Sequence, residues 1–185
     1  YASVVFKIPV MNTRLFVKNF SLNQGRLGDL NVYGAWDNEK RGIYLDASIQ
    51  DISASPSRVT GMIYPLKPES GLDLNIDAHE LNFKFLEFYM KSIAQDIKGR
   101  GTGKVHFDGK FKGLNLDGAV MTDASMKFDI LNTHFAVRDT INLAPTGLKF
   151  NNMQIADMEG LSGTVNVFLR FQHFKNINYR FEIQA

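Results

Sequence analysis

Cysteine is absent from the 185 residues, which excludes disulfide bonds, thiolate nucleophiles and cysteine-based zinc sites. Long apolar runs are also absent, and no stretch approaches the roughly 20 consecutive apolar residues that a membrane-spanning helix needs. Basic runs that could follow a phosphate backbone are missing too, because 21 Lys and Arg and 19 Asp and Glu are dispersed along the chain. We therefore expect no transmembrane helix in this segment and no nucleic-acid partner.

Histidine is sparse, and its four residues lie far apart at His79, His106, His134 and His173. No pair has the close spacing typical of metal ligands, so we predict neither a metal site nor a cofactor. His106 and Asp108 are two residues apart on a polar strand face, which indicates a solvated pair rather than a catalytic one.

A glycine-rich stretch at 99–104 (GRGTGK) looks superficially like a phosphate-binding loop. Such loops follow a strand and open a helix, whereas this stretch is expected to close a helix and lead to a strand. No GxSxG element is present either. We predict that the protein is not an enzyme and has no catalytic residues.

The dominant positive feature is a two-residue alternation of apolar and polar side chains, which is typical of strands with one dry and one wet face. Fifteen Phe and six Tyr add to this β character. The clearest alternating runs are 30–36, 43–49, 72–78, 105–111, 126–130, 165–171 and 177–183. Turn signals such as Asp37-Asn38, Ser55-Pro56-Ser57, Asp108-Gly109, Pro145-Thr146-Gly147 and Asn151-Asn152 separate strands, which predicts an antiparallel meander.

One segment departs from this pattern. At about 82–98 apolar residues recur at three- and four-residue steps, and Gly99 follows as a stop signal, which predicts one amphipathic helix. A sheet of about ten strands is on the order of 48 Å wide, whereas a helix of about 16 residues spans roughly 24 Å. One helix cannot cover such a face.

We therefore expect a mainly β fold, in which an antiparallel meander curls into a half-open barrel or taco-like trough containing that helix. No linker divides the chain, so residues 1–185 are expected to form a single β-rich segment. The sequence begins at Tyr1 without an initiator Met or a leader, and we interpret it as a segment excised from a larger envelope protein.

An ordered series of glycine-spaced strand motifs carries a family resemblance. The motifs are 97–105 (IKGRGTGKV), 114–119 (LNLDGA), 130–133 (ILNT), 148–152 (LKFNN), 155–160 (IADMEG), 163–165 (GTV) and 173–183 (HFKNINYRFEI), preceded by 32–36 (VYGAW), 61–65 (GMIYP) and 81–83 (LNF). This series resembles the periplasmic β segment of the TamB family, the translocation and assembly module proteins related to AsmA. The resemblance covers about residues 30–185.

The resemblance implies a Gram-negative parent protein anchored in the inner membrane by an N-terminal helix not present here, with a long β-rich body in the periplasm. It implies a non-enzymatic role in outer-membrane biogenesis, either carrying phospholipid between the membranes or assisting assembly of outer-membrane proteins. A phospholipid or another acyl-chain ligand and an outer-membrane barrel assembly partner would then be the partners. An isolated segment could also dimerise through sheet edges.

In this hypothesis acyl chains lie along the dry face, where each buried CH₂ contributes roughly 0.8 kcal/mol. The same alternation would build the closed core of a β-sandwich, so each residue has both interpretations. The candidate lipid-binding residues that line the groove are Leu45, Ile49, Leu74, Ile76, Val105, Phe107, Phe128, Ile130, Phe135, Val137, Val165, Val167, Leu169, Tyr179, Phe181 and Ile183.

Two alternatives stay open. A chaperone or scaffold could bind client strands by β-augmentation, which needs an accessible sheet edge rather than a face. A carbohydrate-binding β-sandwich would need exposed aromatic side chains on the wet face, and Trp36 is the single tryptophan available.

Overall fold

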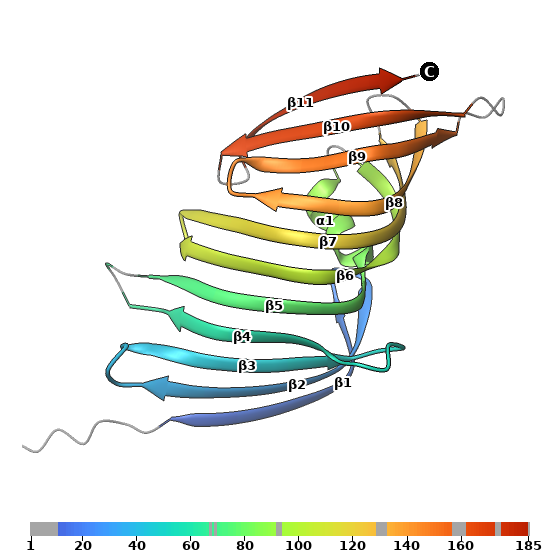
Figure 1. Ribbon diagram of the computed structural model, residues 1–185. Helices are drawn as coiled ribbons and strands as arrows, with labels where there is room; N and C mark the ends of the chain where they lie inside the picture. Colours follow the sequence, from blue (N-terminus) through green and yellow to red (C-terminus); the bar gives the residue numbers. More distant parts are fainter. Residues whose placement is uncertain are drawn as a thin grey trace, which may run out of the picture.

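The computed structural model describes residues 11–66, 68, 70–91, 94–128, 133–156, 162–172 and 175–184. Its strands are β1 (Asn12–Leu22), β2 (Gly25–Asp37), β3 (Gly42–Gln50), β4 (Ser57–Tyr64), β5 (Gly71–Asn82), β6 (Ala94–Lys110), β7 (Gly113–Phe128), β8 (Thr133–Ala144), β9 (Gly147–Ala156), β10 (Ser162–Gln172) and β11 (Lys175–Gln184). They form one sheet in which every strand pairs antiparallel with its neighbours in sequence (Figure 1). The predicted mainly β antiparallel meander is confirmed.

The strand register separates a dry face from a wet face, as the alternation predicted. Residues paired across an antiparallel ladder point to the same side of the sheet. One continuous row across β3 to β7 pairs Leu45, Gly61, Leu74, Phe107 and Leu116. The neighbouring row, one residue along each strand, runs through Tyr44, Met62, Asp73, Asp108 and Asn115, and within it Met62 is buried at 7% exposure.

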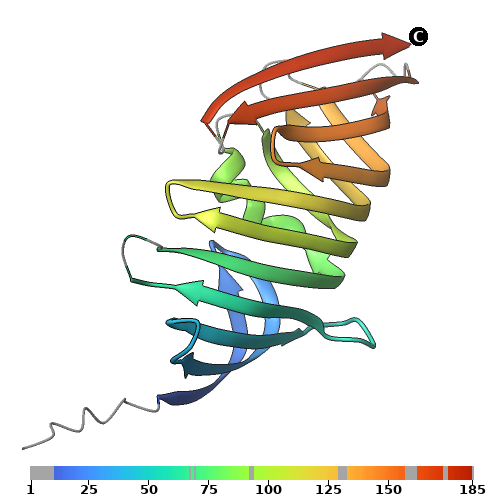
Figure 2. The same ribbon diagram turned by 60° about the vertical axis from the view of Figure 1, so that its left-hand side comes forward.

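The sheet curls without closing. Figures 1 and 2 show the long strands bending at one side, so that the sheet wraps around the helical segment that lies on its concave side. Bulges with a left-handed residue at Asn19, Glu80 and Asp96 interrupt β1, β5 and β6, and bulges of this kind bend a strand and increase its twist. Within the part of the chain that the structure describes, β1 pairs only with β2, and β11 only with β10. The expected half-open trough is therefore present.

The single helix is present, but the prediction that it covers about 82–98 is wrong. A 3₁₀ turn, η1 (Phe83–Leu86), leads directly into one turn of α-helix, α1 (Glu87–Met90). Strand β6 already begins at Ala94. Residues 94–98 of the predicted helix are therefore strand.

A β-bulge explains why this strand has a helix-like spacing. The register of β6 against β7 shifts between Gln95 and Lys98, and Asp96 has a φ of 53°. The extra residue in the bulge places Ala94 and Ile97, three apart in sequence, on the same face, where they are 0% and 1% exposed. The bulge therefore gives two apolar residues on one strand face a spacing of three residues, where a regular strand has a spacing of two.

Two predicted turns also lie inside strands. Asp108-Gly109 belongs to β6, and the hairpin turn follows at residues 111–112. Asn151-Asn152 belongs to β9, which continues to Ala156 with a register shift against β10. In both places the ladder of a neighbouring strand outweighs the local turn preference.

The best-packed core lies in the C-terminal half, beneath the helical segment. It consists of Ala94, Ile97, Met126, Val137, Phe150 and Val167, all in β6 to β10. Phe83, Leu86 and Met90 of the helical segment pack against this cluster. No helix among the described residues is long and apolar enough to cross a membrane.

Candidate apolar binding face

The dry face divides into a covered and an open section. The covered section is the core cluster beneath the helical segment. The open section, as we define it, is the set of half-buried apolar residues on β2 to β6: Leu30, Val32, Leu45, Ile49, Val59, Ile63, Leu72, Ile76, Val105 and Phe107. The register joins these residues into adjacent rows, such as Leu30–Ile49 and Val59–Ile76–Val105. Because eight helical residues cannot cover a face this wide, part of the apolar surface remains in contact with solvent.

The sixteen predicted lining residues divide between these sections. Five of them lie in the open section: Leu45, Ile49, Ile76, Val105 and Phe107. Three are buried, since Leu74 is 9%, Val137 1% and Val167 0% exposed. These three are packed by the protein itself.

The remaining predicted residues lie toward the C-terminus. The backbone ladder pairs Met126 with Phe135, Val165 with Ile183, Val167 with Phe181 and Leu169 with Tyr179. Phe128 ends β7, paired with Ala94 on one side and Thr133 on the other. Ile130 lies outside the described residues.

Glycines on the dry face were missed as part of the site. Gly99, Gly101 and Gly103 lie within β6 and alternate in phase with Val105 and Phe107. Gly101 is buried, and a Cβ there would collide with the ring of Phe83 and with Val120. Gly101 therefore lets the helical segment approach the sheet closely, whereas a Cβ at Gly99 or Gly103 would meet the neighbouring strand β7. Their two-residue spacing was the available signal, and the stretch was interpreted as the end of a helix leading into a strand.

The wet face carries ion pairs between neighbouring strands. The guanidinium of Arg58 donates two hydrogen bonds to the carboxylate of Asp46, at 2.9 and 2.6 Å. His106 Nε2 lies 2.8 Å from Asp73 Oδ1, so its partner is Asp73 rather than Asp108. The hydrogen bond to Asp73 raises the pKa of His106, and the charges of Asp73, Asp108 and Asp117 add to this effect. Both pairs are solvated, which agrees with a wet face.

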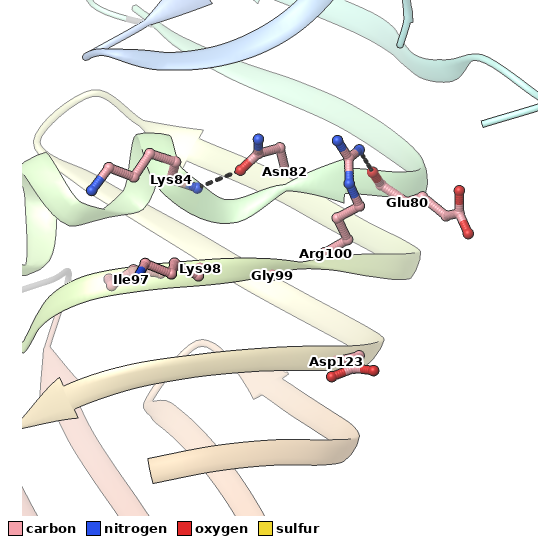
Figure 3. A pocket seen from close by; sticks show the side chains of 8 residues that line it. All are labelled: Glu80, Asn82, Lys84, Ile97, Lys98, Gly99, Arg100 and Asp123. Carbon is pink, nitrogen blue, oxygen red and sulfur yellow. Dashed lines mark hydrogen bonds between the residues drawn. The ribbon is translucent and has the colours of Figure 1, made fainter. Parts of the chain in front are cut away.

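A pocket of about 560 Å³, lined mainly by polar and charged residues, lies where β5 to β7 meet the helical segment (Figure 3). Its lining residues are Glu80, Asn82, Lys84, Ile97, Lys98, Gly99, Arg100 and Asp123. Arg100 donates to the carbonyl of Glu80 at 2.7 Å and to Asp51 at 2.8 Å. The backbone amide of Lys84 donates to the side chain of Asn82 at 2.9 Å, and Lys84 Nζ pairs with Glu87 at 2.5 Å.

The polar groups of this pocket thus serve the structure. Both signs of charge are present, and the side chains of Arg100 and Lys84 already have partners. Among the residues that the structure describes, no group of three or more His, Asp or Glu side chains could hold a metal ion. The open section of the dry face is therefore the stronger candidate site.

No family model, no curated protein and no solved structure matches the chain.

Proposed function

We propose that this chain is a TamB-like β-trough segment of a periplasmic envelope protein, and that its open section carries phospholipid acyl chains between inner and outer membrane. The observation that supports this proposal is the open section itself, an apolar surface running across five strands on the concave side of the sheet. Acyl chains match such a surface because they have apolar groups along their whole length and need no directional bonds.

The chemistry of the two faces suits this role. Burial of acyl chains on the open section would contribute roughly 0.8 kcal/mol per CH₂ removed from water. The headgroup would stay in water at the open side of the trough. No bond is made or broken, so the proposal assigns no catalytic residue.

The test compares lipid retained by the purified protein with lipid retained by face variants. Native mass spectrometry and lipid extraction are applied to the wild type, to Phe107→Asp and to Ile76→Asp, whose side chains lie in the open section. Met121→Asp is the matched control, because Met121 is 65% exposed and lies on the wet face of β7 between Thr102 and Thr140. Val167→Asp is avoided because a charge at a fully buried position would unfold the protein.

We expect copurified phospholipid in the wild type and in Met121→Asp, and its loss in the folded open-section variants. Lipid-free wild-type protein would contradict the proposal. Equal lipid content in all folded variants would contradict it as well, because the lipid would then bind elsewhere.

A second candidate function is supported by edge strand β1. This strand pairs with β2 alone in the described structure, and Met11, Leu15 and Phe16 beside or within it are 51%, 52% and 59% exposed. An unpaired apolar edge is suited to adding a strand from a client, from the outer-membrane barrel assembly partner or from a second copy. Trp36 lies half-buried on the dry face opposite Ile43, so it gives no support to carbohydrate binding on the wet face.

Leu15→Lys together with Phe16→Lys tests the edge function, because lysine on an edge strand opposes strand addition. Crosslinking to a synthetic barrel-strand peptide should fall in this variant and persist in Phe107→Asp. The lipid-carrying function predicts instead that retained phospholipid falls in Phe107→Asp and persists in the edge variant.

A further inference from the structure

An exposed aromatic pair lies on the side of the helical segment that faces away from the core cluster. Phe88 is 56% and Tyr89 63% exposed. Their rings meet edge to face, with centroids 5.4 Å apart and an interplanar angle of 85°. The ammonium group of Lys91 lies 5.6 Å from the centroid of Phe88. Two adjacent aromatic rings and a cation are thus displayed together.

The helical segment that carries this pair is fixed to the sheet. Phe83, Leu86 and Met90, on the other side of the same two turns, pack against the core cluster. Glu87 Oε2 accepts a hydrogen bond from the backbone amide of Ile97 in β6 at 3.1 Å and pairs with Lys84. The aromatic rings therefore project from an anchored support, so little ordering is required when they bind.

We propose that Phe88, Tyr89 and Lys91 form a membrane-docking tip that inserts into the headgroup region of an anionic phospholipid bilayer. Tyrosine and other amphipathic aromatic rings favour the membrane interface, where the ring meets the acyl boundary and the polar end stays hydrated. Lysine beside them suits an anionic headgroup surface, because its stem covers apolar area while its ammonium reaches the lipid phosphates.

Charge complementarity favours an anionic bilayer over a neutral apolar partner. Within the helical segment and the residue after it, Lys84 and Glu87 form an ion pair that neutralises both charges, so the ammonium of Lys91 beside the rings is the remaining net positive charge. Lys98 lies close enough to Glu87 to lower its pKa further, although less than Lys84 does. The formal charge of the whole chain, +2, has the same sign.

The inference deepens the proposed function, because docking would bring the trough next to its source of lipid. It rests on that function for its biological use, but vesicle binding can be measured whether or not the open section holds acyl chains. The two proposals can therefore fail separately.

The experiment is cosedimentation with phosphatidylcholine vesicles prepared with and without phosphatidylglycerol. The double variant Phe88→Ala with Tyr89→Ala is compared with the wild type and with Phe111→Ala. Phe111 is a matched control because it is 51% exposed in the turn between β6 and β7 and belongs to no such cluster. Thermal unfolding of each variant confirms that it is folded.

We expect the double variant to bind vesicles about tenfold more weakly, since two partly inserted rings are lost, and Phe111→Ala to bind as the wild type does. Lys91→Gln should weaken binding to vesicles with phosphatidylglycerol and leave binding to phosphatidylcholine alone unchanged. Wild-type binding by the folded double variant would overturn the proposal, as would a wild type that binds neither vesicle.

Native mass spectrometry of the same variants separates the two proposals. Retained phospholipid with no vesicle binding would overturn the docking tip and leave the lipid trough standing. Vesicle binding by protein that retains no lipid would overturn the lipid trough and leave the docking tip standing.

Discussion

Phe83 of the helical segment packs directly over Gly101 of β6, and their contact leaves no room for a Cβ at residue 101. Gly101→Ala should therefore destabilise the protein by about 1–3 kcal/mol, the range for overpacking a close contact. Gly34→Ala is the matched control, because the nearest atoms to its added Cβ lie at 3.8 Å. We expect that control to change stability by less than about 1 kcal/mol. Urea unfolding measures both, and equal midpoints would contradict the assignment.

A double-mutant cycle attributes the cost to this contact. Phe83→Leu removes the ring that a Cβ at residue 101 would meet, so combining it with Gly101→Ala should cost less than the sum of the single changes. Additive costs would instead assign the strain to Val120, the other side chain that a Cβ on Gly101 would approach.

The two sections of the dry face should differ in how much they stabilise the fold. Val167 is fully buried in the covered section, whereas Val105 is half-buried in the open section. Removal of the two methyl groups by Val167→Ala should cost about 1.5–3 kcal/mol, including the cavity left behind. Val105→Ala should cost less than half as much, since its site is already open to solvent. Equal costs in urea unfolding would mean that the open section is closed in solution.

Side-chain alternation was sufficient to predict the strands and their dry face, because two-residue periodicity is a direct consequence of strand geometry, and the turn signals between them predicted the antiparallel order. It was insufficient where a bulge changed the period, which is why Ala94 and Ile97 were assigned to a helix. Alternation also assigns a residue to a face but not to a degree of burial. Val105 and Val167 have the same local pattern, yet Val167 belongs to the packed core cluster and Val105 is half-buried, a difference that depends on tertiary packing.

Glycine spacing was the informative signal that was misinterpreted. Gly99, Gly101 and Gly103 follow the strand period, yet their composition resembled a loop. Gly101 is required because of Phe83, about eighteen residues earlier in the chain, and no local pattern reveals such a contact. The exposed pair Phe88–Tyr89 was hidden for a related reason, because the sequence does not show which side of a short helix the sheet will cover.

Glu87 should give the fold a dependence on acidic pH. Its pKa is lowered chiefly by the hydrogen bond from Lys84, with smaller effects from the charge of Lys84, the amide of Ile97 and Lys98, against an opposing effect of burial. A carboxyl group with a lowered folded-state pKa stabilises the protein above its unfolded pKa, and this contribution is lost as pH falls through the folded pKa. Lys84 is 39% exposed, so screening limits the pair to about 0.5–1 kcal/mol at neutral pH.

Glu87→Gln should remove that contribution and flatten the acidic side of the stability profile. Glu87→Ala should be less stable still, because the amide of Ile97 then loses its acceptor. Urea unfolding from neutral to acidic pH measures the three proteins. Parallel profiles for the wild type and Glu87→Gln would show that another carboxyl group causes the acid sensitivity.

His106, on the wet face, should give the stability of the fold the opposite dependence on pH. Its pKa is raised above the ordinary histidine value chiefly by the hydrogen bond to Asp73, while burial opposes the shift and the charges of Asp73, Asp108 and Asp117 add to it. A raised folded-state pKa means that the pair stabilises the fold fully below the unfolded pKa, and that this contribution is lost as pH rises through the folded pKa.

Asp73→Asn should lower the pKa of His106 toward an ordinary value. Asp117→Asn should lower it less, because Asp117 acts through charge alone. Titration of the imidazole protons by NMR measures each shift. A larger effect from Asp117→Asn would mean that the His106–Asp73 hydrogen bond does not persist in solution and that the strand register, rather than this pair, aligns β5 with β6.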